Sequence, residues 1–389
     1  MNKKIMLLAR DPGGANTVIP LAESLRERGY QVDLYGKDLA LKRYRQMGLK
    51  GQDITEILAE IKTSSWEDFL SQQHPDFIIT GTSGDDFTER YLWEAARSIG
   101  IKTFAILDQW MNYGIRFSNF TLKEQGQYWQ NKLHPYLPDY ILVMDETARQ
   151  EMLSAGIDGR RVKISGQPYF DLIVSARNSF SAEQILKVKR ELGLQPDELI
   201  FTFISEPISQ DYADSNGELF WGFDEKSTCS MLLHTLDKVL ERSSQRVRLI
   251  IKQHPRENED NYSFLNNEIS NEHISISTVK DIDSWSLLRA SDLVCGMSSM
   301  LLMEAIILGC PVLSIQIGLN RASPLILVKR GILSPILKQE ELENTLRTIL
   351  VDKDIPIINW HIESGAVDKV ITYMEELLCI NWPSTVEKR

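Results

Sequence analysis

The sequence predicts two α/β domains, each a Rossmann-like parallel sheet, that face each other across a cleft. Apolar runs of strand length alternate with longer amphipathic stretches along most of the 389 residues, as βαβ units require. At roughly 150 residues per domain, this length also favours more than one domain. We expect a first domain at 1–177, a second at 178–364, and a C-terminal helix with a polar tail at 365–389 that packs back across the hinge.

The two periodicities place the elements in order. In the first half, strands are expected at residues 5–9, 32–35, 77–80, 103–107, 140–143 and 162–164, and helices at 15–28, 87–99 and 146–155. In the second half, strands are expected at 200–204, 249–252, 274–276, 293–295 and 312–315, and helices at 182–192, 228–242, 284–290, 299–308 and 339–350. The intervening segments 117–136 and 206–226 are long enough for loops with a function.

Charge and composition exclude several classes of protein. With 43 basic and 54 acidic side chains, the net charge is −11, which disfavours nonspecific nucleic-acid binding because that requires basic surfaces. No apolar run reaches the roughly 18–20 residues of a membrane span, and the N-terminus lacks the features of a signal peptide. We therefore expect a cytoplasmic protein, and a homo-oligomer remains open. The four cysteines, Cys229, Cys295, Cys310 and Cys379, lack metal-site spacing and are expected to be reduced core residues.

A glycine pair follows the first expected strand, in the sequence Asp11-Pro12-Gly13-Gly14. Glycines let a backbone approach a ligand closely, and the N-terminus of a helix attracts anions. Asp11 is a candidate catalytic acid or base here, although capping of the helix explains it equally well. The spacing matches neither a dinucleotide-binding fingerprint nor a P-loop, so the sequence implies no NAD, ATP or other cofactor.

Polar side chains gather after the strand at 103–107. The segment contains Asp108, Gln109, Asn112 and Arg116, at the sheet edge where open α/β sheets bind ligands. We expect Asp108 to act in catalysis and the other three to bind substrate; an exposed, hydrogen-bonded loop is the alternative. Asp85 and Asp86 follow another strand and either line the same cleft or cap a helix.

A His-containing turn follows the strand at 249–252, in Lys252-Gln253-His254-Pro255-Arg256. A histidine at a strand end can donate to a phosphate or to a leaving oxygen, and Lys252 adds positive charge. A structural histidine is the alternative. Glu206, after the first strand of the second domain, is expected to contact a base, a sugar or the other domain.

Hydroxyl groups begin the helix expected at 299–308. Ser298 and Ser299 together with free N–H groups suit a pyrophosphate, and Glu304 lies in an otherwise apolar helix, where it can accept hydrogen bonds from ribose hydroxyls. The alternative is that the serines cap the helix and that Glu304 lies at its edge. Asp281-Ile282-Asp283 fits the letters of a metal-binding D-x-D motif, but its place before Ser284 favours helix capping, so we expect no metal site.

Taken together, these segments resemble enzymes of the GT-B architecture. Lys252-Gln253-His254-Pro255 followed by Gly296-Met297-Ser298-Ser299 resembles the His-Pro and Ser-Ser motifs of bacterial polysialyltransferases and capsule Kdo transferases. The segment Gly166-Gln167-Pro168-Tyr169-Phe170-Asp171 is similar to the interdomain segment of CDP-glycerol glycerophosphotransferases and UDP-N-acetylglucosamine 2-epimerases. The resemblance implies that His254 contacts the donor phosphate or assists the leaving group, that Ser298 and Ser299 hold the phosphate, and that Glu304 binds ribose.

The function expected from these observations is metal-independent, inverting transfer of a sugar from a nucleotide-linked donor to a hydroxyl acceptor. The acceptor is expected to be a glycan or a lipid-linked molecule of envelope polysaccharide or glycoconjugate synthesis, with Asp11 and Asp108 as candidate bases. Exposed aromatic residues, Trp110, Tyr113, Phe117, Tyr128 and Trp129, would allow contact with a lipid-linked acceptor at the inner face of a membrane, and closure over a soluble acceptor is the equal alternative. A nucleotide-sugar 2-epimerase or hydrolase on the same fold, and a noncatalytic binding protein of an envelope pathway, are the two alternatives.

Overall fold

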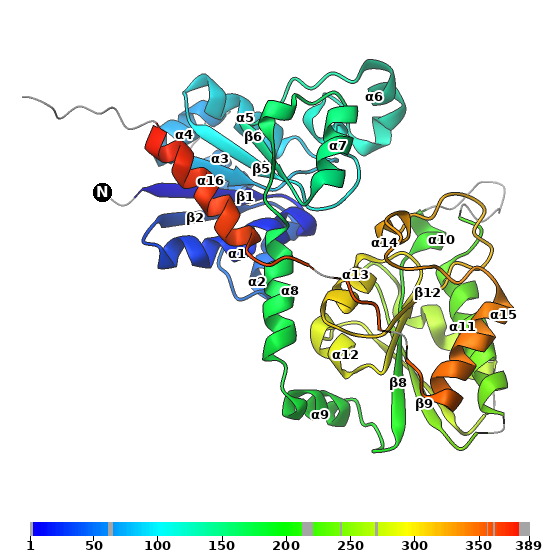
Figure 1. Ribbon diagram of the computed structural model, residues 1–389. Coiled ribbons are helices and arrows are strands. Elements are labelled where there is room, and N and C mark those ends of the chain that lie inside the picture. The colour runs from blue at the N-terminus through cyan, green and yellow to red at the C-terminus, as the bar shows by residue number, and fades with distance from the viewer. Residues whose placement is uncertain are drawn as a thin grey trace, which may run out of the picture. The chain divides into compact units, whose positions relative to one another are not determined.

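Two compact units make up the chain in a computed structural model that describes residues 3–60, 65–211, 221–241, 243–268, 271–355, 357–360 and 362–380. Unit 1 consists of Met1–Leu172 and Glu363–Arg389, and unit 2 of Ile173–Ile362. The division falls inside a helix, between Leu172 and Ile173, somewhat before the boundary expected at 177/178. The two parallel-sheet α/β domains that the sequence predicts are confirmed (Figure 1).

Unit 1 is a seven-stranded sheet in the order β3-β2-β1-β4-β5-β6-β7, and every pairing is parallel. Its strands are β1 (Lys4–Ala9), β2 (Gln31–Gly36), β3 (Gln52–Asp53), β4 (Phe77–Thr80), β5 (Lys102–Ile106), β6 (Tyr140–Val143) and β7 (Val162–Ile164). Its helices are α1 (Pro12–Glu27), α2 (Leu39–Gln46), α3 (Ile54–Glu60), α4 (Trp66–Gln73), α5 (Thr88–Ser98), α6 (Gln125–Asn131), α7 (Glu146–Ser154) and α16 (Ala366–Ile380), with short 3₁₀ turns η1 (Ile115–Phe117), η2 (Leu122–Glu124) and η3 (Gly159–Arg161).

Both faces of this sheet are covered, which explains why strands β1, β4 and β6 are mostly apolar. Ile5 and Leu7 of β1 face a core that α1, α2 and α16 complete, whereas Met6 and Leu8 face a second core with α3, α4 and α5. The alternation follows from the two-residue period of a strand. Although α16 comes last in the sequence, it packs beside α1 (Figure 1).

Unit 2 is a five-stranded parallel sheet in the order β10-β9-β8-β11-β12. Its strands are β8 (Glu198–Ile204), β9 (Arg246–Lys252), β10 (Ile274–Val279), β11 (Leu293–Gly296) and β12 (Val312–Ser314). Its helices are α9 (Ala182–Glu191), α10 (Ile208–Asp211), α11 (Glu225–Leu240), α12 (Ser284–Ala290), α13 (Met300–Ile307), α14 (Ile326–Lys329) and α15 (Gln339–Arg347), with a 3₁₀ segment η4 (Glu259–Asn267) and a π-helical turn η5 (Thr348–Asp352). Helix α8 (Pro168–Ser179) contains the division between the units.

The structure corrects several expectations about the connecting segments. The segment 117–136 is not a loop throughout, because it contains η2 and α6. The second suspected loop, 206–226, contains α10, and its residues 212–220 lie outside the described part of the chain. Pro168 begins α8, since proline fits the first turn of a helix. The polar tail expected at the C-terminus lies outside the described residues from 381 onward.

Exposure of single side chains was also predicted incorrectly in places. Trp110, Phe117 and Tyr128 are 7%, 0% and 2% exposed, so they cannot form the membrane-contacting surface expected of them, whereas Trp129 is 55% exposed. Cys379 lies exposed on α16, while the other three cysteines are buried and free as predicted. A free cysteine in a core behaves as a small apolar side chain.

Candidate functional site

In each sheet the strand order reverses at one point, called the topological switch point. Open α/β sheets bind their ligands at the carboxyl ends of the strands beside this point. In unit 1 this point lies between β1 and β4, and in unit 2 between β8 and β11. The carboxyl ends of β1 and β5 lead to Asp11 and Asp108, and those of β8 and β11 lead to Glu206 and Ser298. The predicted polar residues therefore concentrate at both switch points.

Two glycines allow helix α1 to approach the end of β4. A Cβ atom on Gly81 would lie 2.5 Å from the Cα of Gly14, which is backbone that cannot move away. A Cβ on Gly13 would lie 1.9 Å from Oδ2 of Asp108. Gly13 and Gly14 therefore lie close to Asp108 and to Gly81; the approach of this backbone to a ligand stays a prediction.

Asp11 caps helix α1, as the simpler interpretation of the sequence proposes. Its Oδ1 accepts a hydrogen bond from the backbone N–H of Gly14 at 2.8 Å. Burial, and then the negative charge of Asp108, raises the pKa of Asp11 to about 6. A carboxyl group with a pKa in this range can exchange protons near neutral pH.

Arg116 holds the neighbouring carboxylate in place. Its Nη1 lies 2.6 Å from Oδ1 of Asp108 and donates to both the carbonyl and the hydroxyl oxygen of Thr82. The Arg116 and Asp108 side chains are only 4% and 9% exposed. The amide of Gln167 donates to the main-chain oxygen of Asp108 at 2.9 Å. Asp108 is thus held from both its side chain and its backbone.

Gln109 and Asn112 lie in the turn that follows Asp108, and both are partly exposed. Asn112 adopts a left-handed conformation with φ of 57°, which asparagine tolerates better than most residues. Next to them, Trp110 donates from Nε1 to Oδ2 of Asp145 at 3.0 Å. The buried tryptophan therefore anchors a turn whose two amide side chains reach the surface.

Sequence reasoning missed one acid in this cluster, Glu89 on α5. Glu89 is 1% exposed, and its Oε1 accepts from the backbone N–H of Arg10. Burial, and then the charge of Asp11, raises the pKa of Glu89 to about 8. The next residue, Arg90, is also buried and donates to the carbonyl oxygens of Ser118 and Phe120.

In unit 2, Glu206 lies at the N-terminus of α13. Its carboxylate accepts from the backbone N–H of Ser298 at 2.7 Å and from the Ser298 hydroxyl at 2.9 Å. Burial raises the pKa of Glu206 to about 7, although the Ser298 hydrogen bonds oppose the shift. Ser299 caps the helix by accepting from the N–H of Leu301. The beginning of this helix thus stabilises a negatively charged oxygen.

Glu304 lies further along α13 and is partly buried. Its Oε2 accepts from Nε1 of Trp285 at 2.7 Å. The Trp285 contact explains how an acid is tolerated in this apolar helix. Nearby, Asp283 caps α12 through the N–H of Ser286, which confirms the capping interpretation of the D-x-D letters.

The His254 turn follows β9, which is the neighbour of β8. The backbone N–H of His254 donates to Oε2 of Glu257 at 2.6 Å, and its Nδ1 accepts from the backbone N–H of Arg256. Burial, and then the charge of Arg256, lowers the pKa of His254. Lys252 is 8% exposed and donates to the carbonyl of Lys280, so its ammonium group is engaged inside the fold. Sequence reasoning missed Glu257, the buried acid that fixes this turn.

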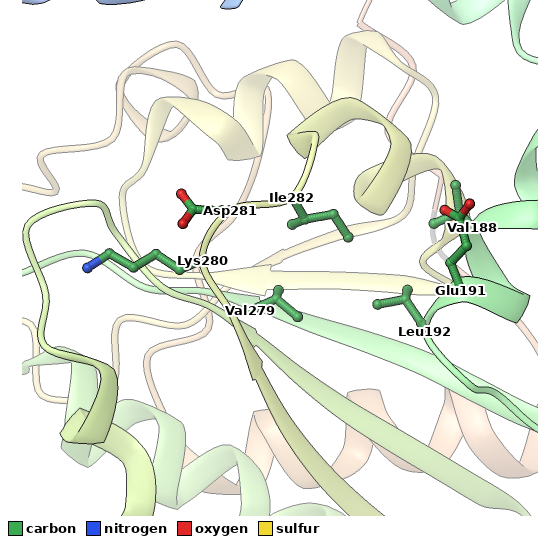
Figure 2. Close-up of a pocket in the computed structure, with 7 residues that line it drawn as sticks. All are labelled: Val188, Glu191, Leu192, Val279, Lys280, Asp281 and Ile282. Atoms are coloured by element: carbon green, nitrogen blue, oxygen red, sulfur yellow. The ribbon is translucent and has the colours of Figure 1, made fainter.

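A hollow of about 330 Å³ in unit 2 lies apart from these groups (Figure 2). It is bordered by α9 and by the segment that follows β10, and its lining consists of Val188, Glu191, Leu192, Val279, Lys280, Asp281 and Ile282. Figure 2 shows Lys280 extending away from Leu192, and its Nζ donates to the carbonyl of Glu257. None of the predicted site residues lines this hollow.

Two kinds of feature are absent from the part of the chain that the structure describes. Within those ranges, no group of three or more His, Cys, Asp or Glu residues is arranged to hold a metal ion. Across the same ranges, no helix combines the length and apolar character of a membrane span.

The fold defines a class, that of two-domain α/β proteins with a GT-B-like fold. The structure is similar to UDP-GlcNAc 2-epimerase from Methanocaldococcus jannaschii, with a TM-score of 0.66 and 14% identity over 96% of this chain and 99% of that one. It is also similar to the Neisseria meningitidis UDP-GlcNAc 2-epimerase bound to UDP-GlcNAc (TM-score 0.65, 15% identity, 97% and 100% coverage). A third similar structure is Anabaena Alr3699/HepE in complex with UDP and glucose (TM-score 0.57, 17% identity, 97% and 100% coverage).

The chain itself belongs to the family DUF354, described as a protein of unknown function, whose model matches residues 118–355. A search of curated proteins found no match. The GT-B-like fold that the sequence resemblance implied is therefore confirmed.

Proposed function

We propose that this protein is a nucleotide-sugar enzyme that transfers a sugar to an acceptor hydroxyl. One observation carries the proposal: at the switch point of unit 1, Asp11 has a pKa near 6 and lies beside Asp108, which Arg116 pairs at 2.6 Å. Whole-length similarity to proteins that bind UDP or UDP-GlcNAc supports the substrate class. In this proposal, unit 1 supplies the proton-transferring acid and unit 2 binds the nucleotide.

Asp11 is the proposed general base. Above pH 6 most Asp11 carboxyl groups are ionised and can accept the proton of an acceptor hydroxyl as its oxygen attacks the anomeric carbon. The bond from that carbon to the nucleotide phosphate breaks in the same step, and inversion of the anomeric centre follows. Base assistance of this kind contributes about 10²–10⁴-fold. Asp108 and Arg116 keep the base in a fixed electrostatic environment.

The proposed phosphate contacts are in unit 2. Helix α13 already stabilises the carboxylate of Glu206 through Ser298, and a phosphate oxygen has the same hydrogen-bonding needs. The Ser299 hydroxyl and the partly exposed ring of His254 are the proposed donors to the leaving nucleotide. Glu304 is the proposed acceptor for ribose hydroxyls.

A 2-epimerase is the second candidate, and two observations favour it. Solved UDP-GlcNAc 2-epimerases share the fold over nearly the whole chain, and Glu89 and Asp11 provide two carboxyl groups with pKa values of about 8 and 6. Removal and return of a proton at one carbon requires both an acid and a base.

One experiment separates the two reactions. The full-length protein is first screened by thermal shift with CMP, UDP, GDP, CDP and TDP, since ligand at 100 times its Kd stabilises by about 2.7 kcal/mol. Sugar nucleotides of the preferred base are then incubated with and without glycan acceptors. Transfer predicts that the sugar is released from its nucleotide rapidly only when acceptor is present. Conversion of the donor alone to its 2-epimer would instead establish epimerisation, and failure of every nucleotide to bind would contradict both.

A further inference from the structure

Unit 1 contains a pocket of about 400 Å³ that the proposed chemistry does not use. Segments after β2 and β4 border it, together with α3 and the beginnings of α4 and α5. Its lining consists of Lys37, Ile54, Thr55, Leu58, Trp66, Asp85, Asp86, Phe87, Thr88 and Tyr91. Because all of these belong to one unit, the pocket is a property of that unit alone.

Aromatic rings form part of the lining. Phe87 and Tyr91 stack with their ring centroids 5.7 Å apart and an interplanar angle of 28°, and Arg90 covers Phe87 with its guanidinium 4.2 Å from the ring centroid. Tyr91 is nevertheless 44% exposed, so this large apolar side chain remains accessible. Trp66 adds a third, partly exposed ring. Because Tyr91 and Arg90 pack against Phe87, the accessible rings are those of Tyr91 and Trp66, which can pack against the C–H face of a pyranose and leave the sugar hydroxyls available.

Carboxylates in the same pocket provide acceptors for those hydroxyls. Asp86 pairs with Lys37 at 2.7 Å and accepts from the N–H of Thr88, which fixes its orientation. Asp85 is exposed, and among the described residues it has no ion-pair partner. An exposed carboxylate attracts hydroxyl donors and repels anions.

The pocket adjoins the acid cluster through Arg10. Nε of Arg10 lies 3.9 Å from Oδ2 of Asp86, and the residue that follows Arg10 is Asp11. The Arg10 backbone also donates to Glu89. A molecule in the pocket would therefore lie next to the turn that carries the proposed base.

We propose that this pocket binds an uncharged saccharide, which is the acceptor of the transfer reaction. The acceptor role of this saccharide rests on the proposed function, whereas the binding of a saccharide in the pocket does not. The aromatic rings select a sugar, and the carboxylate of Asp85 disfavours acidic sugars such as sialic acid or sugar phosphates.

The test measures binding of sugars to the full-length protein without any nucleotide, by saturation-transfer difference NMR followed by calorimetry. The probes are neutral disaccharides of glucose, galactose, mannose, rhamnose and N-acetylhexosamines, with α2,8-linked disialic acid as the acidic probe. We expect at least one neutral probe to bind and the acidic probe not to bind. Y91A and D85N should each weaken that binding, Y91A by about tenfold.

W129A is the matched control, because Trp129 is an exposed aromatic residue of unit 1 outside the pocket. Both pocket side chains are exposed, so Y91A and D85N should fold, which circular dichroism checks. Binding of the acidic probe alone, absence of binding by all probes, or binding that survives both pocket variants would overturn the inference. Sugar binding without any transfer would contradict the proposed function and leave the pocket assignment standing.

Discussion

The two switch points use a carboxylate at the start of a helix in different ways. Asp11 accepts one backbone hydrogen bond and has a second acid, Asp108, against its helix, whereas Glu206 is bound twice by Ser298. Burial raises the pKa of both, to about 6 and about 7. The charge of Asp108 adds to the upward shift of the Asp11 pKa, whereas the Ser298 hydrogen bonds oppose the shift at Glu206 while they hold the start of α13 in place.

The sharpest contrast is expected in turnover. D11N should lower the transfer rate by about 10²–10⁴-fold, because an amide cannot accept the proton of the acceptor hydroxyl. In the wild type, the rate should rise with pH through about 6 as Asp11 ionises. Steady-state rates with saturating donor across pH 5–8 measure both effects. D158N is the control, since Asp158 also caps by accepting a backbone N–H. Equal losses in the two variants would mean that Asp11 only caps.

The ion pair beside Asp11 should matter most for stability. R116M leaves the Asp108 carboxylate buried without its cation, which costs about 3–5 kcal/mol. Urea unfolding followed by circular dichroism measures the loss. R160M removes an arginine that is 91% exposed in its ion pair, and it should cost less than about 1 kcal/mol. A comparable loss in both variants would show that burial of the Arg116 pair has no special weight.

Titration of Glu206 should make the free energy of unfolding depend on pH. Its pKa in the folded protein, about 7, lies above the ordinary value of 4.5. The contribution of Glu206 to the free energy of unfolding is therefore fully present below pH 4.5 and is lost as the pH rises through 7. E206Q should therefore match the wild type near pH 4.5 and exceed it by about 3 kcal/mol above pH 7. Urea unfolding of both proteins from pH 4.5 to 8.5 tests this. A difference that does not vary with pH would exclude titration of Glu206.

A smaller effect is expected where helix α1 meets β4. G81A places a Cβ 2.5 Å from the Gly14 Cα, and forcing the two apart should cost about 1–3 kcal/mol. G126A is the control, because nothing lies within 4 Å of a Cβ added at Gly126. Thermal unfolding compares the two variants. An unchanged midpoint for G81A would mean that the helix can shift without loss.

Most strands were predictable because both faces of each sheet are covered, which makes runs such as 77–79 continuously apolar. Strand β3 (Gln52–Asp53) was not predicted, because it is short and polar. A second rule located Asp11 and Asp108: the residues that follow parallel strands meet at one edge of the sheet. Helices α2, α3, α4 and α6 were not predicted, because each has only seven or eight residues, and a helical period is hard to recognise over so short a stretch. Glu89 and Glu257 were missed for another reason: their burial depends on elements distant in sequence, which no local pattern records.

The position of α16 bears on how the protein is made. Val370, Ile371 and Met374 of this helix complete the core of unit 1, yet they are synthesised after all of unit 2. During translation, part of the apolar surface of the first sheet therefore stays uncovered until the second unit and α16 have emerged from the ribosome. A chaperone that shields this surface in the nascent chain would act during that interval.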